Sequence, residues 1–280
     1  MSTESTKRPT VETGTFLAEL PYVRVGNGPQ NLLILPGITL ENAPPNGLAV
    51  WTYRLGFGHF ARNYTVYVIN RKHDMPPGYT TQDMAADYAR VIVSELGSSH
   101  LMGFSTGGSI AQYVALDRPE LVKRLVLVVS ASRLSDEGRE TCERWRKLAR
   151  GRRWRELRAD MASVNVTSEA NKRIARAFMA VFGRFVLGTP SDPSDFLTTL
   201  EADLGHDSTD RLHKISMPTL IIGGSEDPFF SERLLRETAG EIPGAELRVY
   251  EGVGHGVPKE RKRQYEDDAL AFLSERSTSV

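Results

Sequence analysis

The chain has 280 residues, and its 35 basic and 35 acidic side chains balance to a formal charge of zero. This length fits one large α/β domain with an insertion, or two modest domains. The balanced charge gives no global electrostatic reason to expect a nucleic acid or an anionic membrane as a partner. The single cysteine, Cys142, excludes an intramolecular disulfide and any zinc site built on several thiolates.

No segment of the sequence indicates export or insertion into a membrane. The N-terminal residues lack the apolar core of a signal peptide, and the longest apolar runs, such as Leu125–Val129, are too short to span a bilayer. A lone cysteine is compatible with a reducing compartment, so we expect a soluble, cytoplasmic protein. We expect residues 1–14 and 276–280 to be flexible polar ends.

Strands and helices alternate over residues 15–132 and again over residues 214–275. The runs "NLLILPG", "YTVYVIN" and "LVLVV" are continuously apolar, which is typical of parallel strands covered on both faces. Residues 133–213 lack this pattern and indicate helices instead, as in "NKRIARAFMAVFGRFVL". The sequence therefore predicts an α/β fold with a mostly parallel, doubly wound sheet, and an inserted helical cap over the C-terminal ends of its strands.

One serine occupies an unusual turn. In "HLMGFSTGGSIAQYVALDRP", Ser105 lies between a predicted strand, His100–Phe104, and a predicted helix, Thr106–Asp117. Gly103 and Gly107 tolerate the crowding of so tight a turn. This G-x-S-x-G arrangement displays the serine hydroxyl at the top of the sheet and points the helix N-terminus at whatever the serine attacks.

The turn has three alternatives to a catalytic role. It could be a plain glycine-rich connection between a strand and a helix. A phosphate-binding loop is disfavoured because Ser109, and not lysine, follows Gly108. A dinucleotide-binding site is disfavoured because no G-x-G-x-x-G follows the first strand.

A catalytic serine needs a base within hydrogen-bonding reach and a carboxylate that orients this base. Asp227 follows an apolar strand in "LIIGGSEDP", and His255 follows the next strand in "RVYEGVGHGVP". Glu226 is a weaker candidate for the acid. The chain order Ser105, Asp227, His255 is the order expected of the α/β-hydrolase arrangement.

With these three motifs in place, the sequence resembles the α/β-hydrolase family of the capped type, from about Thr15 to Ser274. The resemblance implies that Ser105 is the nucleophile, that His255 is the base which then protonates the leaving group, and that Asp227 holds the imidazole.

The family pattern also implies an oxyanion hole made by the backbone amides of Thr106 and Ile38. Many members carry a His-Gly pair in the loop before the second donor, whereas this chain has Pro36-Gly37. Proline removes no catalytic N–H there, but it removes the supporting hydrogen bonds of the histidine. The segment "NRKHDMPPGYT" replaces the Asp-Arg-Gly loop of many relatives, with no consequence that the sequence reveals.

Two features of the predicted cap bear on the substrate. Phe178, Phe182 and Phe185 form one aromatic stripe at helical spacing. Such a stripe is by default the packing face of the cap, and the alternative is that it lines an apolar substrate pocket. The basic run Arg144–Arg158 is interleaved with acids, and we interpret it as a solvated helix face.

These observations predict a serine hydrolase that cleaves a carboxylic ester, or a related acyl bond, of a small and partly apolar molecule. A carbon–carbon bond hydrolase, a lactonase and a perhydrolase could use the same triad. An alternative that is not an enzyme is a receptor for a small ligand with the same fold. The sequence of the cap shows no large exposed apolar surface of the kind that a partner protein would bind, which argues against this alternative. We expect no metal and no organic cofactor. The expected partner is a small-molecule substrate, without nucleic acid or membrane, and a homodimer is left open.

Overall fold

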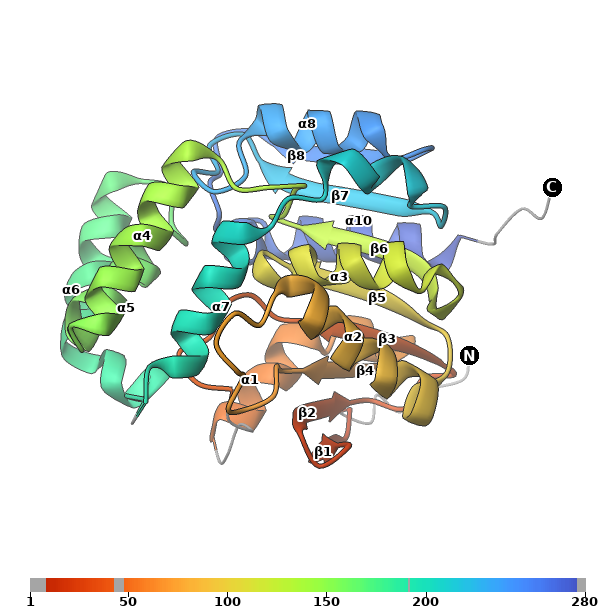
Figure 1. Ribbon diagram of the computed structural model, residues 1–280, viewed down its shortest axis with the longest axis horizontal. Helices are drawn as coiled ribbons and strands as arrows, with labels where there is room; N and C mark the ends of the chain where they lie inside the picture. The colour runs from red at the N-terminus through yellow and green to blue at the C-terminus, as the bar shows by residue number, and fades with distance from the viewer. Residues whose placement is uncertain (1–8, 43–47, 191, 276–280) are drawn as a thin grey trace, which may run out of the picture.

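The computed structural model describes residues 9–42, 48–190 and 192–275. A central twisted sheet carries helices on both faces, and a group of further helices lies to one side of it (Figure 1). The strands are β1 (Val11–Phe16), β2 (Leu20–Val25), β3 (Gln30–Leu35), β4 (Tyr64–Ile69), β5 (Ser99–Phe104), β6 (Val122–Val128), β7 (Thr219–Gly224) and β8 (Glu246–Tyr250). Their order in the sheet is β1-β2-β4-β3-β5-β6-β7-β8; β2 pairs antiparallel with β1 and β4, and the other neighbours are parallel.

Helices bury both faces of the sheet, which is why its central strands are continuously apolar. The helices outside the cap are α1 (Leu48–Phe57), α2 (Thr81–Val91), α3 (Thr106–Asp117), α8 (Glu232–Glu241), α9 (Val257–Glu260) and α10 (Lys262–Ser274). Successive strand residues face opposite sides, so Leu101 of β5 joins the core formed with α2, α3 and α8, whereas Met102 joins the core formed with α10. The predicted mostly parallel α/β architecture is thus confirmed.

The N-terminal part of the chain is more ordered than we expected. Strand β1 begins at Val11 and pairs with β2 as far as Phe16, so residues 11–14 of the segment interpreted as flexible belong to the sheet. The ladder of backbone hydrogen bonds with β2 explains why so polar a stretch is held. Residues 1–8 and 276–280 lie outside the described part of the chain.

Four α-helices lie between β6 and β7 in the sequence, within the predicted cap, and form the group at one side in Figure 1. These helices are α4 (Asp136–Arg150), α5 (Trp154–Ser163), α6 (Glu169–Leu187) and α7 (Ser194–Gly205). The basic run within them is not simply a solvated face, because Trp145, Leu148 and Trp154 are buried. Arg158 is also buried, with Nη1 donating to the carbonyl of Gly188 at 2.8 Å.

Candidate active site

Ser105 lies between the end of β5 and the first residue of α3, as the sequence predicts. Its backbone has φ 50° and ψ −121°, a conformation that is strained for a residue with a side chain. A Cβ added at Gly107 would lie 2.0 Å from the carbonyl oxygen of Leu35, and one added at Gly103 would lie 2.4 Å from the carbonyl oxygen of Gly107. Strand and helix approach too closely here for any side chain, and this tight turn leaves Ser105 partly exposed at the edge of the sheet.

The structure brings the three residues of the predicted triad together. The distance from Ser105 Oγ to His255 Nε2 is 3.1 Å, and that from His255 Nδ1 to Asp227 Oδ2 is 2.8 Å. The Asp227 side chain is fully buried, and its Oδ1 accepts hydrogen bonds from the amides of Phe229 at 2.8 Å and Phe230 at 3.2 Å. These amides fix the carboxylate, and through it the imidazole ring.

The weaker candidate for the acid occupies a different place. The hydrogen-bond partner of His255 Nδ1 is the carboxylate of Asp227, whereas the amide of Glu226 donates to the carbonyl of Val253 at 3.0 Å. Both residues line a neighbouring cavity, so the contact with His255 is what distinguishes them. The geometry therefore favours Asp227 as the residue that orients the histidine.

The loop after β3 lies against Ser105, where the second oxyanion donor is expected. A Cβ added at Gly37 would lie 3.4 Å from Cβ of Ser105. A buried guanidinium that the sequence did not single out holds this loop: Arg71 donates from Nη1 to the carbonyl of Pro36 at 3.1 Å, and from Nη2 to the carbonyl of Gly37 at 3.1 Å and to Thr39 Oγ1 at 3.0 Å. Arg71 thus supports the loop in a chain whose Pro36 cannot make the hydrogen bonds of a histidine.

Arg71 is only 1% exposed, so its charge has little contact with water. Burial lowers the pKa of the guanidinium, and the nearby carboxylates of Asp203 and Asp195 act in the opposite direction. Arg71 lies in the segment "NRKHDMPPGYT", which departs from the loop of many relatives, and this departure was the only signal in the sequence. The contacts of Arg71 with the loop after β3 depend on β4 lying beside β3 in the sheet.

The other predicted oxyanion residue makes an unexpected contact with the cap. Thr106 Oγ1 donates to Oδ2 of Asp203, which lies on α7, at 2.5 Å. Burial raises the pKa of Asp203 to about 6. The folded protein therefore binds a proton at this carboxyl more readily than the unfolded chain between pH 3.8 and about 6, and this group costs stability as the pH rises through that interval.

Helix α7 has a second attachment to the core. Asp195 accepts hydrogen bonds from the amides of Asp74 at 3.2 Å and Met75 at 2.9 Å, in the loop that follows β4. Asp195 and Asp203 thus tie the two ends of α7 to the loop after β4 and to the first residue of α3. The sequence did not reveal either contact, because both join the cap to distant parts of the chain.

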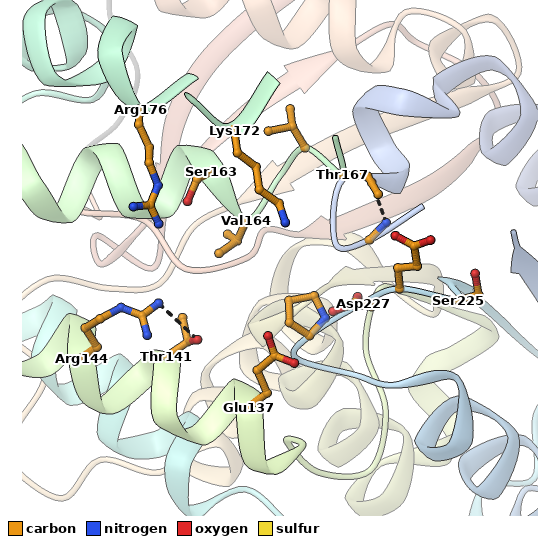
Figure 2. A pocket seen from close by; sticks show the side chains of 14 residues that line it. Glu137, Thr141, Arg144, Ser163, Val164, Thr167, Lys172, Arg176, Ser225 and Asp227 are labelled. Atoms are coloured by element: carbon orange, nitrogen blue, oxygen red, sulfur yellow. Dashed lines mark hydrogen bonds between the residues drawn. The ribbon is translucent and has the colours of Figure 1, made fainter. Parts of the chain in front are cut away.

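A cavity of about 420 Å³ lies on the Asp227 side of the site. Figure 2 shows Glu137 and Arg144 of α4 and Lys172 and Arg176 of α6 pointing into the same space. Asp160 accepts from Arg144 Nε at 2.9 Å and from Arg176 Nη2 at 2.7 Å, so one carboxylate holds both guanidinium groups. The cavity therefore presents anchored cations together with acids, which suits a polar part of a ligand better than an acyl chain.

The aromatic stripe of the cap is neither the packing face nor part of this cavity. Phe178, Phe182 and Phe185 are 51%, 50% and 73% exposed, whereas Met179 and Gly183 are the buried residues of α6. The packing interpretation is wrong because α6 turns its small and flexible residues toward α5. A role of the three rings in a substrate pocket stays a prediction.

A mostly parallel sheet with a serine displayed between β5 and α3, and an acid and a histidine after β7 and β8, has the architecture of an α/β hydrolase. The chain belongs to the alpha/beta hydrolase family, whose family model matches residues 32–267. This assignment confirms the resemblance that the sequence motifs indicated.

Several known proteins are similar to this chain. The 2-hydroxy-6-oxononadienedioate/2-hydroxy-6-oxononatrienedioate hydrolase of a Pseudomonas species is 27% identical over 198 residues, which make up 68% of each chain. MGS-M2, an alpha/beta hydrolase enzyme from a Medee basin deep-sea metagenome library, superposes with a TM-score of 0.81 and 17% identity over 96% of this chain and 99% of its own. The enol-lactonase of Burkholderia xenovorans LB400 superposes with a TM-score of 0.77 and 18% identity over 94% and 100%. These two superpositions establish the shared fold.

Proposed function

We propose that this protein is a serine hydrolase that cleaves a carboxylic ester, or a related acyl bond, of a small and partly apolar molecule. The proposal rests on the contact between Ser105 Oγ and His255 Nε2 at 3.1 Å, with Asp227 behind the imidazole at 2.8 Å. A serine hydroxyl is a weak nucleophile at neutral pH, and a base within hydrogen-bonding reach takes its proton as it attacks.

In the proposed acylation, Ser105 Oγ forms a bond to the acyl carbon while its proton passes to Nε2 of His255. Asp227 accepts a hydrogen bond from Nδ1 and stabilises the imidazolium. The amides of Thr106 and Ile38 hold the negative charge that develops on the carbonyl oxygen. When the tetrahedral intermediate collapses, the bond to the leaving alcohol breaks and His255 gives its proton to the alcohol oxygen.

In the proposed deacylation, a water molecule replaces the alcohol. His255 takes a proton from this water as its oxygen bonds to the acyl carbon. The second tetrahedral intermediate then expels Ser105, which recovers its proton from His255, and the carboxylic acid leaves. Every proton in this cycle passes through one imidazole nitrogen, and the acyl-enzyme needs no group beyond these side chains and amides.

Cleavage of a carbon–carbon bond on the same triad is the second candidate. It is favoured by the match to the Pseudomonas hydrolase, whose name describes a dicarboxylate with a keto group. The cavity beside Asp227 adds a specific observation, because Arg144, Lys172 and Arg176 line it and could meet a substrate carboxylate.

The first experiment is steady-state hydrolysis of p-nitrophenyl esters graded from acetate to octanoate. We expect many turnovers by the wild type and their loss in Ser105→Ala, and the preferred chain length would size the acyl site. The matched control is Ser94→Ala, an exposed serine in the helical turn Ile92–Leu96 after α2, whose Oγ donates to the carbonyl of Arg90. Its activity should equal that of the wild type.

Other outcomes would redirect the proposal. Turnover of a 2-hydroxy-6-oxo-dienoate without turnover of the esters would favour the carbon–carbon hydrolase. A reaction that stops after one turnover would favour a receptor. Ester hydrolysis that survives in Ser105→Ala would contradict the serine mechanism itself.

A further inference from the structure

Helix α6 is the outermost helix of the cap, at the edge of the molecule in Figure 1. It packs on α5 through a narrow face in which Met179 and Gly183 are buried. A Cβ added at Gly183 would lie 3.1 Å from Arg158 of α5, so the two helices approach closely along this line. Within the part of the chain that the structure describes, most side chains on the other faces of α6 are exposed.

The uncovered part of α6 is strongly apolar. Large exposed apolar groups on one face of a folded protein commonly mark an interaction site, since water around them is costly. This face, which we term the α6 stripe, consists of Ile174 (67% exposed), Phe178 (51%), Val181 (61%), Phe182 (50%), Phe185 (73%) and Val186 (58%). It contradicts the expectation that the cap lacks a large apolar signature.

Basic side chains border the α6 stripe. Two of the four basic residues of the helix are engaged elsewhere, because Lys172 pairs with Glu169 and Arg176 pairs with Asp160 beside the cavity. Arg173 and Arg184 are exposed near the two ends of the helix, and the guanidinium of Arg184 lies 4.4 Å from the centre of the Phe185 ring. The matching partner surface would have an apolar interior to receive the rings and negative charges at its boundary to pair with the arginines.

We propose that α6 is an interfacial helix that binds an anionic lipid surface, with the α6 stripe in the acyl region and the arginines at the headgroups. Helices with phenylalanine on one face and basic residues beside it lie in the plane of such an interface. None of the helices in the described residues is long and apolar enough to cross a membrane. A second copy of the chain fits less well, because two α6 helices would bring like charges together.

This proposal departs from the expectation that the chain has no membrane partner. That expectation was based on the net charge of zero, which averages over the whole surface. Attraction to anionic lipids depends instead on the charges within about a Debye length, about 8 Å at physiological salt, of the membrane. Arg173 and Arg184, which are exposed on α6, can therefore act although the whole chain is neutral.

The residues that flank α6 lie against segments that neighbour the candidate active site. Just before the helix, Thr167 Oγ1 accepts a hydrogen bond from the amide of Gly254, next to His255, at 2.9 Å. Just after it, a Cβ added at Gly188 would lie 3.7 Å from Oε2 of Glu41, in the loop that follows Ile38. If the proposed hydrolase function holds, lipid binding would keep the site close to a source of amphiphilic esters, but the binding itself does not depend on that function.

Co-sedimentation with vesicles tests the proposal without any measurement of activity. The probe is the purified full chain with vesicles of equal parts phosphatidylglycerol and phosphatidylcholine, compared with phosphatidylcholine alone, at low and high salt. We expect preferential binding to the anionic vesicles. The triple variant Phe178→Ser, Phe182→Ser, Phe185→Ser should lower the binding constant about tenfold or more. Replacing Arg173 and Arg184 by glutamine should lower it by about fivefold for each charge at low salt.

The matched control is Val93→Ser, because Val93 is 58% exposed but lies just before the start of β5, at the opposite end of the sheet from Ser105. It should bind like the wild type. If the triple variant lost its fold, judged by circular dichroism, Phe185→Ser alone would repeat the test at the most exposed ring. Failure of the wild type to bind anionic vesicles, or equal binding by the serine variants, would overturn the proposal. So would a dimer in solution that these variants dissociate, since a second copy would then cover the stripe.

Discussion

Replacing Arg71 by methionine should separate the positioning of the oxyanion loop from simple stability. The guanidinium makes hydrogen bonds to the carbonyls of Pro36 and Gly37, directly before the expected donor Ile38. Loss of one oxyanion donor costs about 2.7–4 kcal/mol of activation free energy, or about 100-fold to 1000-fold in kcat. We expect Arg71→Met to lower kcat by about 100-fold with little change in KM, because the amide is displaced and not removed.

The same substitution should lower the free energy of unfolding. Two partly buried carbonyl groups lose their partner, at up to about 1–3 kcal/mol each, so a loss of up to about 2–6 kcal/mol is expected. Stopped assays at a temperature where the variant remains folded, combined with calorimetry, would measure both effects. Arg124→Met is the matched control, because Arg124 is also buried and donates to the carbonyl of Glu275 at 2.8 Å, far from Ser105. It should lose stability and keep its kcat. An unchanged kcat in folded Arg71→Met would refute a role of this residue in holding the oxyanion loop.

Three further predictions follow from contacts at the site. Asp227→Asn should retain the fold and lower kcat by about 10⁴-fold, as measured on p-nitrophenyl acetate, because its amide cannot favour the required imidazole tautomer. Asp203→Asn should raise the melting temperature at pH 8, and this gain should shrink as the pH falls from about 6 toward 3.8; a gain independent of pH would contradict burial as the cause of the raised pKa. Gly107→Ala should prevent folding or cost several kcal/mol by urea titration, since its Cβ would lie 2.0 Å from the oxygen of Leu35, whereas Gly240→Ala, in open space on α8, should stabilise by about 0.5–1 kcal/mol.

The lipid-binding proposal also changes how the alternatives are weighed. The receptor hypothesis was disfavoured because the cap was expected to lack an exposed apolar surface, and the α6 stripe removes this objection. Turnover measurements therefore become the decisive observation between an enzyme and a receptor. The serine, histidine and aspartate are compatible with both.

Sequence patterns predicted most of the fold and the approach of the three site residues. Ser105, Asp227 and His255 could be found because each follows a strand, and the C-terminal ends of parallel strands meet at one edge of the sheet. The prediction of a flexible N-terminal segment extended a few residues too far. A polar strand such as β1 is held by backbone hydrogen bonds, and these leave little trace in side-chain composition.

The amino-acid sequence by itself determined the order of strands and helices, the tight turn at Ser105 and the candidates for its partners. These depend on local spacing and on glycines that no other residue could replace without a clash. Only the tertiary structure decided that Arg71 holds the loop before Ile38, that Asp203 of the cap accepts a hydrogen bond from Thr106, and that the α6 stripe is exposed. Each of these depends on which neighbour a side chain meets across the fold, and a helical period predicts an apolar face without saying what will cover it.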